Sequence, residues 1–191
     1  MSFDEKIKSL DISLPEAKAP VGSYVATKIS GKLIFISGQI SMTQNGDLIK
    51  GKIGKDLTTE QGYEAAKRCG LSIVAQVKKS CDDDLSKIKS CVKLTGFVNS
   101  TDNFTEQPKV INGASEIIAS IFGAAGMHTR AAVSTNSLPL GVAVEVDAIF
   151  RGFQVKIVQV GPRGLQLGPE QDTGRLHVPL PLVAECLEAA T

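Results

Sequence analysis

Residues 126–150 read GMHTRAAVSTNSLPLGVAVEVDAIF, two β-prone runs separated by a Leu-Pro turn. In the second run, alternate positions are apolar and predict one buried face of a strand: Val142, Val144, Val146, Ala148 and Phe150. Successive side chains of a strand point to opposite faces, so Glu145 and Asp147 belong to the other face. Arg130 stands at the start of the first run. We interpret Arg130 and Glu145 as the two charged ends of a small active site.

The overall composition is that of an ordinary globular domain. The chain has 191 residues, of which 42% are hydrophobic and 21% charged, and its formal net charge is +1. This length allows one domain with a substantial core. The near-neutral charge does not favour tight binding to a nucleic-acid backbone. No apolar run is long enough to span a membrane and no signal-peptide pattern is present, so we expect a cytoplasmic protein.

The four cysteines do not indicate metal or dithiol chemistry. They are Cys69, Cys81, Cys91 and Cys186, and no two of them have the C-x-x-C spacing. Cysteines of a cytoplasmic protein are usually reduced, so we expect small buried side chains.

Periodicity along the chain predicts an α+β domain. Thr58 and Gln61 have the spacing of a capping box, and Ser30-Gly31 has the composition of a hairpin turn. The expected elements are strands at 23–29 and 32–37, a helix from 58 to about 80, a strand at 91–98, a helix at 109–122, and strands at 131–136 and 141–150. This order fits a sheet with both helices on one side. Its other face must then be covered by something else, and oligomerisation is the economical solution.

Two finer expectations concern the third strand and the chain ends. In the strand at 91–98, we expect Val92, Leu94, Gly96 and Val98 to share one side. Residues 1–17 are polar and are expected to form a loose N-terminal arm before a domain at 18–151. Glycine and proline become frequent in residues 152–191, which we interpret as an extension that is disordered, appended or produced by read-through.

Several motifs together resemble one known family. They are Gly-Ser-Tyr-Val at 22–25, Phe-Ile-Ser-Gly-Gln-Ile at 35–40, Lys-Leu-Thr-Gly-Phe-Val at 93–98, His-Thr-Arg-Ala-Ala-Val at 128–133, and Leu-Pro-Leu-Gly-Val-Ala-Val-Glu-Val-Asp-Ala-Ile at 138–149. Over residues 18–150 the chain resembles the reactive intermediate deaminase family (RidA or YjgF), which is often labelled L-PSP endoribonuclease. The resemblance implies a chorismate-mutase-like β-β-α-β-α-β-β fold that assembles as a homotrimer. Its strands form a barrel with the helices outside, and the active sites lie in clefts between subunits.

The resemblance also implies roles for six residues. Arg130 resembles the arginine that grips the substrate carboxylate, and Glu145 the glutamate that orients or activates the attacking water. The remaining substrate-binding positions are Tyr24 near the pocket mouth, Ser37 and Gly38 where backbone lines the pocket, and Asn112 beside the site. One departure is Ala132, where many relatives have cysteine, so thiol-dependent activities are not implied.

Structural roles compete with these assignments. From residue type alone, Arg130 would be a surface ion pair and Glu145 a charge that blocks edge aggregation, a role that suits Asp147 better. Tyr24 is equally well interpreted as a half-buried strand aromatic, and Asn112 as an ordinary helix-face amide. His128 is interpreted as a turn residue, and His177 lies in the extension.

The function that the resemblance implies is hydrolysis of 2-imino acids or enamines, such as 2-iminopropionate and 2-aminoacrylate, to 2-keto acids and ammonia. No metal or organic cofactor is required for this reaction. Two alternatives are a trimer that binds small carboxylates or acts as a chaperone without turnover, and an endoribonuclease. The second alternative is disfavoured by the near-neutral charge and by the lack of a histidine pair in the main domain.

Overall fold

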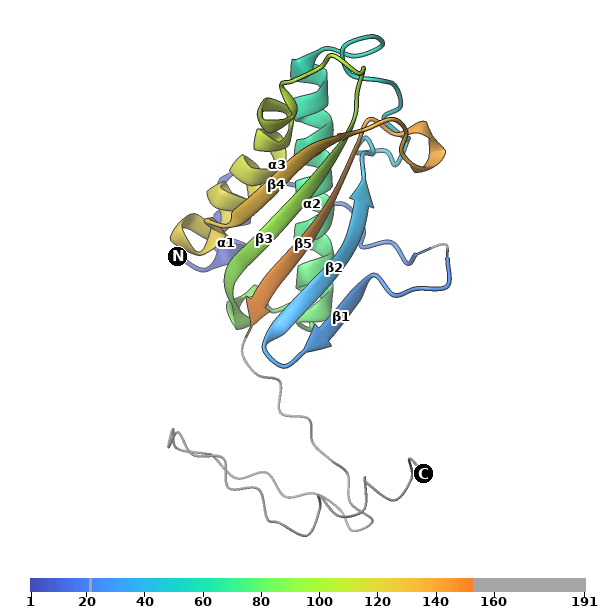
Figure 1. Ribbon diagram of the computed structural model, residues 1–191. Coiled ribbons are helices and arrows are strands. Elements are labelled where there is room, and N and C mark those ends of the chain that lie inside the picture. The colour runs from blue at the N-terminus through green and yellow to red at the C-terminus, as the bar shows by residue number, and fades with distance from the viewer. Residues whose placement is uncertain (21, 153–191) are drawn as a thin grey trace, which may run out of the picture. The chain divides into compact units, whose positions relative to one another are not determined.

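A computed structural model describes residues 1–20 and 22–152 of the chain and contains a five-stranded sheet of order β1-β2-β5-β3-β4 (Figure 1). The strands are β1 (Thr27–Ser30), β2 (Leu33–Ile40), β3 (Ile88–Asn99), β4 (Thr129–Thr135) and β5 (Val144–Gly152). All neighbouring pairs are antiparallel except β3 and β4. A parallel pair needs a long crossover connection, and the helix between β3 and β4 provides it.

Both long helices lie on one side of the sheet, as predicted (Figure 1). Helix α2 (Thr59–Ser80) contacts β2 and β5, and α3 (Gln107–Phe122) contacts β3 and β4. The Thr58–Gln61 capping box is present at the start of α2. Gly123 ends α3 with a φ of 58°, which glycine adopts without a steric penalty. The α+β architecture predicted from the sequence is therefore confirmed.

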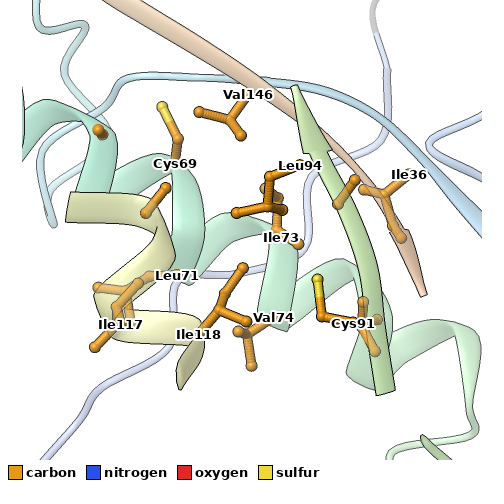
Figure 2. Close-up of a cluster of buried hydrophobic side chains, with 14 of the residues drawn as sticks. Ile36, Cys69, Leu71, Ile73, Val74, Cys91, Leu94, Ile117, Ile118 and Val146 are labelled. Carbon is orange, nitrogen blue, oxygen red and sulfur yellow. The ribbon is translucent and has the colours of Figure 1, made fainter. Parts of the chain in front are cut away.

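The core fills the space between the helices and the sheet (Figure 2). Val144, Val146, Ala148 and Phe150 are all buried there, so the predicted apolar face of β5 is confirmed. Cys69, Cys81 and Cys91 are buried free thiols, and burial raises the pKa of Cys91 to about 12. Cys186 lies outside the described residues. These three cysteines have the packing role that was expected of them.

The expectation for Val92 is wrong because β3 contains a bulge. Cys91 pairs with Phe150 and Lys93 pairs with Ile149, so one extra residue of β3 lies between two adjacent partners on β5. A bulge of this kind changes which face the following side chains occupy. Cys91 and Leu94 are consequently buried, whereas Val92 is exposed.

The expectation of a loose N-terminal arm is also wrong. Helix α1 (Phe3–Ser9) begins with a Ser2–Glu5 capping box, and Ile7 is buried. The Phe3 ring meets that of Phe122 on α3 at a centroid distance of 4.8 Å. The polar composition obscured the two apolar residues, which are four positions apart and therefore share one helix face. The predicted extension at 152–191 lies outside the described residues, except for Gly152 at the end of β5.

In the part of the chain that the structure describes, no helix covers the face of the sheet opposite α2 and α3. Phe35 pairs with Ile149 and Val133 pairs with Phe97, and these residues occupy the open face. Phe35 and Val133 are 40% and 45% exposed. Exposed apolar side chains of this kind are typical of a surface that another chain covers, and that cover stays a prediction. No helix in the described ranges has the length and hydropathy needed to cross a bilayer.

Replacement of Gly113 tests the close approach of α2 and α3. A Cβ at this position would overlap the carbonyl oxygen of Tyr63 and lie 2.9 Å from the Lys67 nitrogen. Because both obstacles are backbone atoms, Gly113→Ala should destabilise the protein by about 2–3 kcal/mol, although alanine favours helix formation. Urea unfolding measures the change, with Ser120→Ala on the same helix as the control. Equal stability of the two variants would contradict this packing.

Candidate active site

Arg130 reaches from β4 to the facing side of α3. Its Nη1 atom donates to Asn112 Oδ1 at 2.8 Å and to Ser115 Oγ at 3.0 Å. Its Nη2 atom donates to the carbonyl oxygen of Pro108 at 3.4 Å. Asn112 and Ser115 are three residues apart and therefore share one face of α3. The structure thus brings together two of the predicted site residues, Arg130 and Asn112.

Within residues 1–20 and 22–152, these contacts leave the Nε edge of the Arg130 guanidinium without a partner. The group has five N–H donors, and its contacts with α3 involve Nη1 twice and Nη2 once. Nε donates to none of the residues that the structure describes, and its N–H lies on the same edge of the planar group as one of the Nη2 hydrogens. Such an edge matches the two oxygens of a carboxylate in a bidentate hydrogen bond. Arg130 is exposed, so this edge is accessible to a ligand.

Glu145 lies on β5, directly beside a bulge in β2. The register of the two strands shifts between Ile36 and Gln39, the segment that contains Ser37 and Gly38. A Cβ on Gly38 would overlap Glu145 Oε1, so the carboxylate rests against the glycine backbone. Glycine at position 38 therefore gives Glu145 the space that it occupies.

Burial raises the pKa of Glu145, and the nearby Asp147 carboxylate adds to the shift. Removing water around a carboxyl group disfavours its charged form, and a second negative charge does the same. An ionised Glu145 is consequently a stronger base than a fully hydrated glutamate. It is suited to orienting a water molecule and accepting its proton.

Ser37 connects β2 to the loop that carries Tyr24. Its hydroxyl donates to the carbonyl oxygen of Val25 at 2.8 Å, and its backbone nitrogen donates to that of Ala26 at 3.0 Å. Tyr24 is 57% exposed, so the description of a half-buried strand aromatic does not fit it. Ser37, Gly38 and Glu145 form a second group of predicted site residues around β2 and β5, and Tyr24 lies on the segment that bonds to Ser37.

Arg130 and Glu145 occupy opposite faces of the sheet in one chain. Arg130 is in register with Leu94, which is in register with Ala148, and this row faces the helices. Glu145 is in register with Phe97, which belongs to the open face. Among the described residues, no hydrogen bond or ion pair joins the two charged groups. The structure therefore places the predicted site residues in two separate groups, which are two candidate half-sites.

Two neighbours of Arg130 were not predicted as site residues. Ser115 carries one of its hydrogen bonds, and His128 lies behind Ser115 with Nε2 at 3.0 Å from the hydroxyl oxygen. The sequence pattern indicated a turn at His128 and no role for Ser115. The spacing of Asn112 and Ser115 was the available signal, but it becomes informative only when α3 is known to face Arg130.

Comparisons with known proteins identify relatives of this chain. The sequence model of the YjgF/chorismate mutase-like family, which is described with an assumed endoribonuclease activity, matches residues 4–150. Protein TCP17 of Trypanosoma cruzi is 44% identical over 144 residues, which are 75% of this chain and 89% of that protein. The 2-iminobutanoate/2-iminopropanoate deaminase of Rattus norvegicus is 26% identical over 139 residues, 72% of this chain and 86% of that protein.

A solved structure supports the same relationship. The crystal structure of protein Atu1372 from Agrobacterium tumefaciens, a protein of unknown function, has 42% sequence identity and a TM-score of 0.73. The alignment covers 78% of this chain and 92% of that one.

Replacement of Glu145 by glutamine tests the electrostatics of the second half-site. The folded chain raises the pKa of Glu145. The protonated carboxyl group therefore stabilises the folded state fully at a pH below its unfolded pKa. This stabilisation is lost as the pH rises through the folded pKa and the group becomes charged. Glu145→Gln should therefore raise Tm by roughly 1–3 °C at pH 7, and the gain should shrink towards pH 4. Thermal unfolding across this range measures it. The control is Glu64→Gln on the exposed surface of α2, and an equal gain there would show that burial of Glu145 is not the cause.

Proposed function

Because the chain belongs to the YjgF/chorismate mutase-like family, we propose that it hydrolyses 2-imino acids, and the enamines that interconvert with them, to 2-keto acids and ammonia. The name of the rat relative supports this class of substrate. The observation that carries the proposal is the free Nε and Nη2 edge of Arg130, held in place by α3. A 2-imino acid presents a carboxylate next to its reactive carbon, and this edge can bind the carboxylate in two hydrogen bonds.

Binding at Arg130 fixes the position of the reacting carbon. The imine carbon is bonded directly to the carboxylate carbon, so a bidentate contact defines both its distance and its orientation. Positioning of this kind lowers the activation barrier because the reacting groups are already aligned. Asn112 and Ser115 take the Nη1 hydrogens and thereby direct the remaining edge of Arg130 away from α3.

Glu145 supplies the proton chemistry in this proposal. Its carboxylate accepts a proton from a water molecule while the water oxygen adds to the carbon of the C=N bond. The nitrogen becomes an amine and, after taking up a proton, leaves as ammonia while the carbonyl forms. The atoms balance as one imino acid and one water giving one keto acid and one ammonia. The raised pKa of Glu145 suits both the uptake and the return of this proton.

The proposal requires more than one copy of the chain at each site. Arg130 lies on the edge strand β4, whereas Glu145 lies on the open face of the sheet. We infer a cytoplasmic homotrimer in which Arg130 of one copy meets Glu145 of the next, with Tyr24 at the mouth of the cleft. This arrangement would also cover the exposed side chains of Phe35 and Val133.

Phosphodiester cleavage, which the family description suggests, is less well supported. His128 is the one histidine in the part of the chain that the structure describes. Both of its ring nitrogens are engaged, Nε2 with Ser115 and Nδ1 with the carbonyl oxygen of Gly126. It is therefore not placed to act as an acid or base on a bound ligand.

Turnover of 2-iminopropionate tests the proposed function. An amino-acid oxidase generates the imine from alanine, semicarbazide traps what remains, and the semicarbazone is followed by absorbance. The wild-type protein should lower semicarbazone formation. Arg130→Ala should reduce kcat/KM by roughly 100-fold, because the carboxylate loses its bidentate partner and the imine carbon its position.

Arg151→Ala is the matched control, because Arg151 is an exposed arginine on β5 away from both half-sites. Its activity should equal that of the wild type. Arg130→Lys should retain part of the activity, since lysine keeps the charge but not the planar pair of donors. The proposal is wrong if the folded wild-type protein accelerates the loss of none of several 2-imino acids. It is also wrong if Arg130→Ala is fully active.

A further inference from the structure

We propose that His128 is a positioning residue that fixes the hydroxyl of Ser115 and, through it, the orientation of the Arg130 guanidinium. The inference rests on the proposed role of Arg130 as the carboxylate-binding group. It assigns a function to two residues, Ser115 and His128, that contact neither the proposed substrate nor Glu145.

The contacts of His128 define which ring nitrogen carries the proton. Nδ1 lies 2.6 Å from the carbonyl oxygen of Gly126, and a carbonyl can only accept, so Nδ1 is the donor. In the neutral ring, Nε2 is then an acceptor. Nε2 lies 3.0 Å from Ser115 Oγ and therefore accepts the hydroxyl proton of Ser115.

The hydroxyl of Ser115 is consequently oriented in one direction. Its single proton points at His128, so a lone pair of Oγ is directed at Nη1 of Arg130, 3.0 Å away. A hydroxyl that donates a hydrogen bond is also a better acceptor, because the two bonds polarise each other. His128 thereby strengthens the contact between Ser115 and Arg130.

Two other helical serines of the chain, Ser80 and Ser120, indicate what Ser115 would do without this partner. Ser80, at the end of α2, donates to the carbonyl oxygen of Val77 at 2.7 Å. Ser120, five residues after Ser115 on α3, donates to the carbonyl oxygen of Ile117 at 2.8 Å. Such bonds to the preceding turn are the usual choice of a serine inside a helix. Ser115 does not bond to the preceding turn. It donates to His128 instead, and the presence of this acceptor explains the difference from Ser80 and Ser120.

The Gly126 carbonyl group, which accepts the hydrogen bond from His128, is held against α3. Gly126 is buried, and a Cβ on it would lie 2.7 Å from the carbonyl oxygen of Ile118 and 2.8 Å from Ala119 Cα. The backbone that accepts from His128 Nδ1 is therefore packed directly on the helix that carries Ser115. The contacts run from Arg130 through Ser115 and His128 to Gly126, and both Ser115 and Gly126 are fixed to α3. The Arg130 guanidinium is therefore held relative to a rigid helix.

Two substitutions of His128 separate positioning from general packing. His128→Gln places an amide oxygen near the position of Nε2 and retains an acceptor for Ser115. His128→Asn retains a donor for Gly126 but does not reach Ser115. Titration with pyruvate, a stable 2-keto acid, reports the carboxylate affinity of each variant. Loss of one hydrogen bond on Arg130 should weaken pyruvate binding by about 3- to 10-fold in His128→Asn and Ser115→Ala, whereas His128→Gln should bind like the wild type.

The double variant Ser115→Ala/His128→Asn tests the order of the contacts. It should bind pyruvate no more weakly than Ser115→Ala alone, since His128 acts only through Ser115. Ser120→Ala is the matched control for removal of a serine hydroxyl from α3, and its affinity should equal that of the wild type. Urea unfolding of every variant separates these effects from a loss of folded protein.

Side-chain NMR of Arg130 gives a readout that needs neither turnover nor ligand. Hydrogen-bonded Nη1 protons should give resolved, slowly exchanging signals in the wild type and in His128→Gln, and broadened signals in His128→Asn and Ser115→Ala. Identical Arg130 signals in all four proteins would overturn the proposal, as would equal pyruvate affinities. If the signals change as expected but no imine is hydrolysed, positioning by His128 stands and the deaminase proposal fails.

Discussion

The alternation of side chains across the sheet is the constraint on which the proposed site depends. It places Arg130 in the row that faces the helices and Glu145 in the row on the open face. Because its row faces the helices, Arg130 forms its hydrogen bonds with α3. Glu145 lies on the same face of the sheet as the exposed Phe35 and Val133. A second copy that covered the apolar face would therefore also bring a new surface to Glu145. In the proposed trimer, burial of the open face and completion of the site are the same event.

Side chains that pack against glycine shape both candidate half-sites. Gly38 leaves the space into which the Glu145 carboxylate folds, and a Cβ on Gly96 would overlap Ile111 of α3. Glycine at position 96 thus lets α3 lie near the sheet, and Asn112 and Ser115 come within hydrogen-bonding distance of Arg130. The positions of small residues and of charged residues are linked, because the packing of α3 determines which donors of Arg130 remain free.

Sequence patterns predicted the parts of the structure that local rules govern. The capping box at Thr58 and the apolar row of β5 follow from spacing along the chain, and both are present. The bulge that exposes Val92 and the docking of α1 through Phe3 depend on pairing and packing partners that are remote in sequence. The same limit applies to the candidate site. Family motifs led to Arg130 and Asn112, but Ser115 and His128 become meaningful only when α3, the turn after it and β4 are placed side by side.

The most direct test of the account is complementation between two inactive variants, Arg130→Ala and Glu145→Gln. Each variant should be inactive alone, because each lacks one half-site. Unfolding a one-to-one mixture in urea and refolding it should create mixed trimers. In these, Arg130 of one copy meets Glu145 of another at about a quarter of the interfaces if mixing is random. The account predicts that about a quarter of the wild-type imine hydrolysis returns. A refolded mixture that stays as inactive as its separate components would show that Arg130 and Glu145 do not act together across two copies.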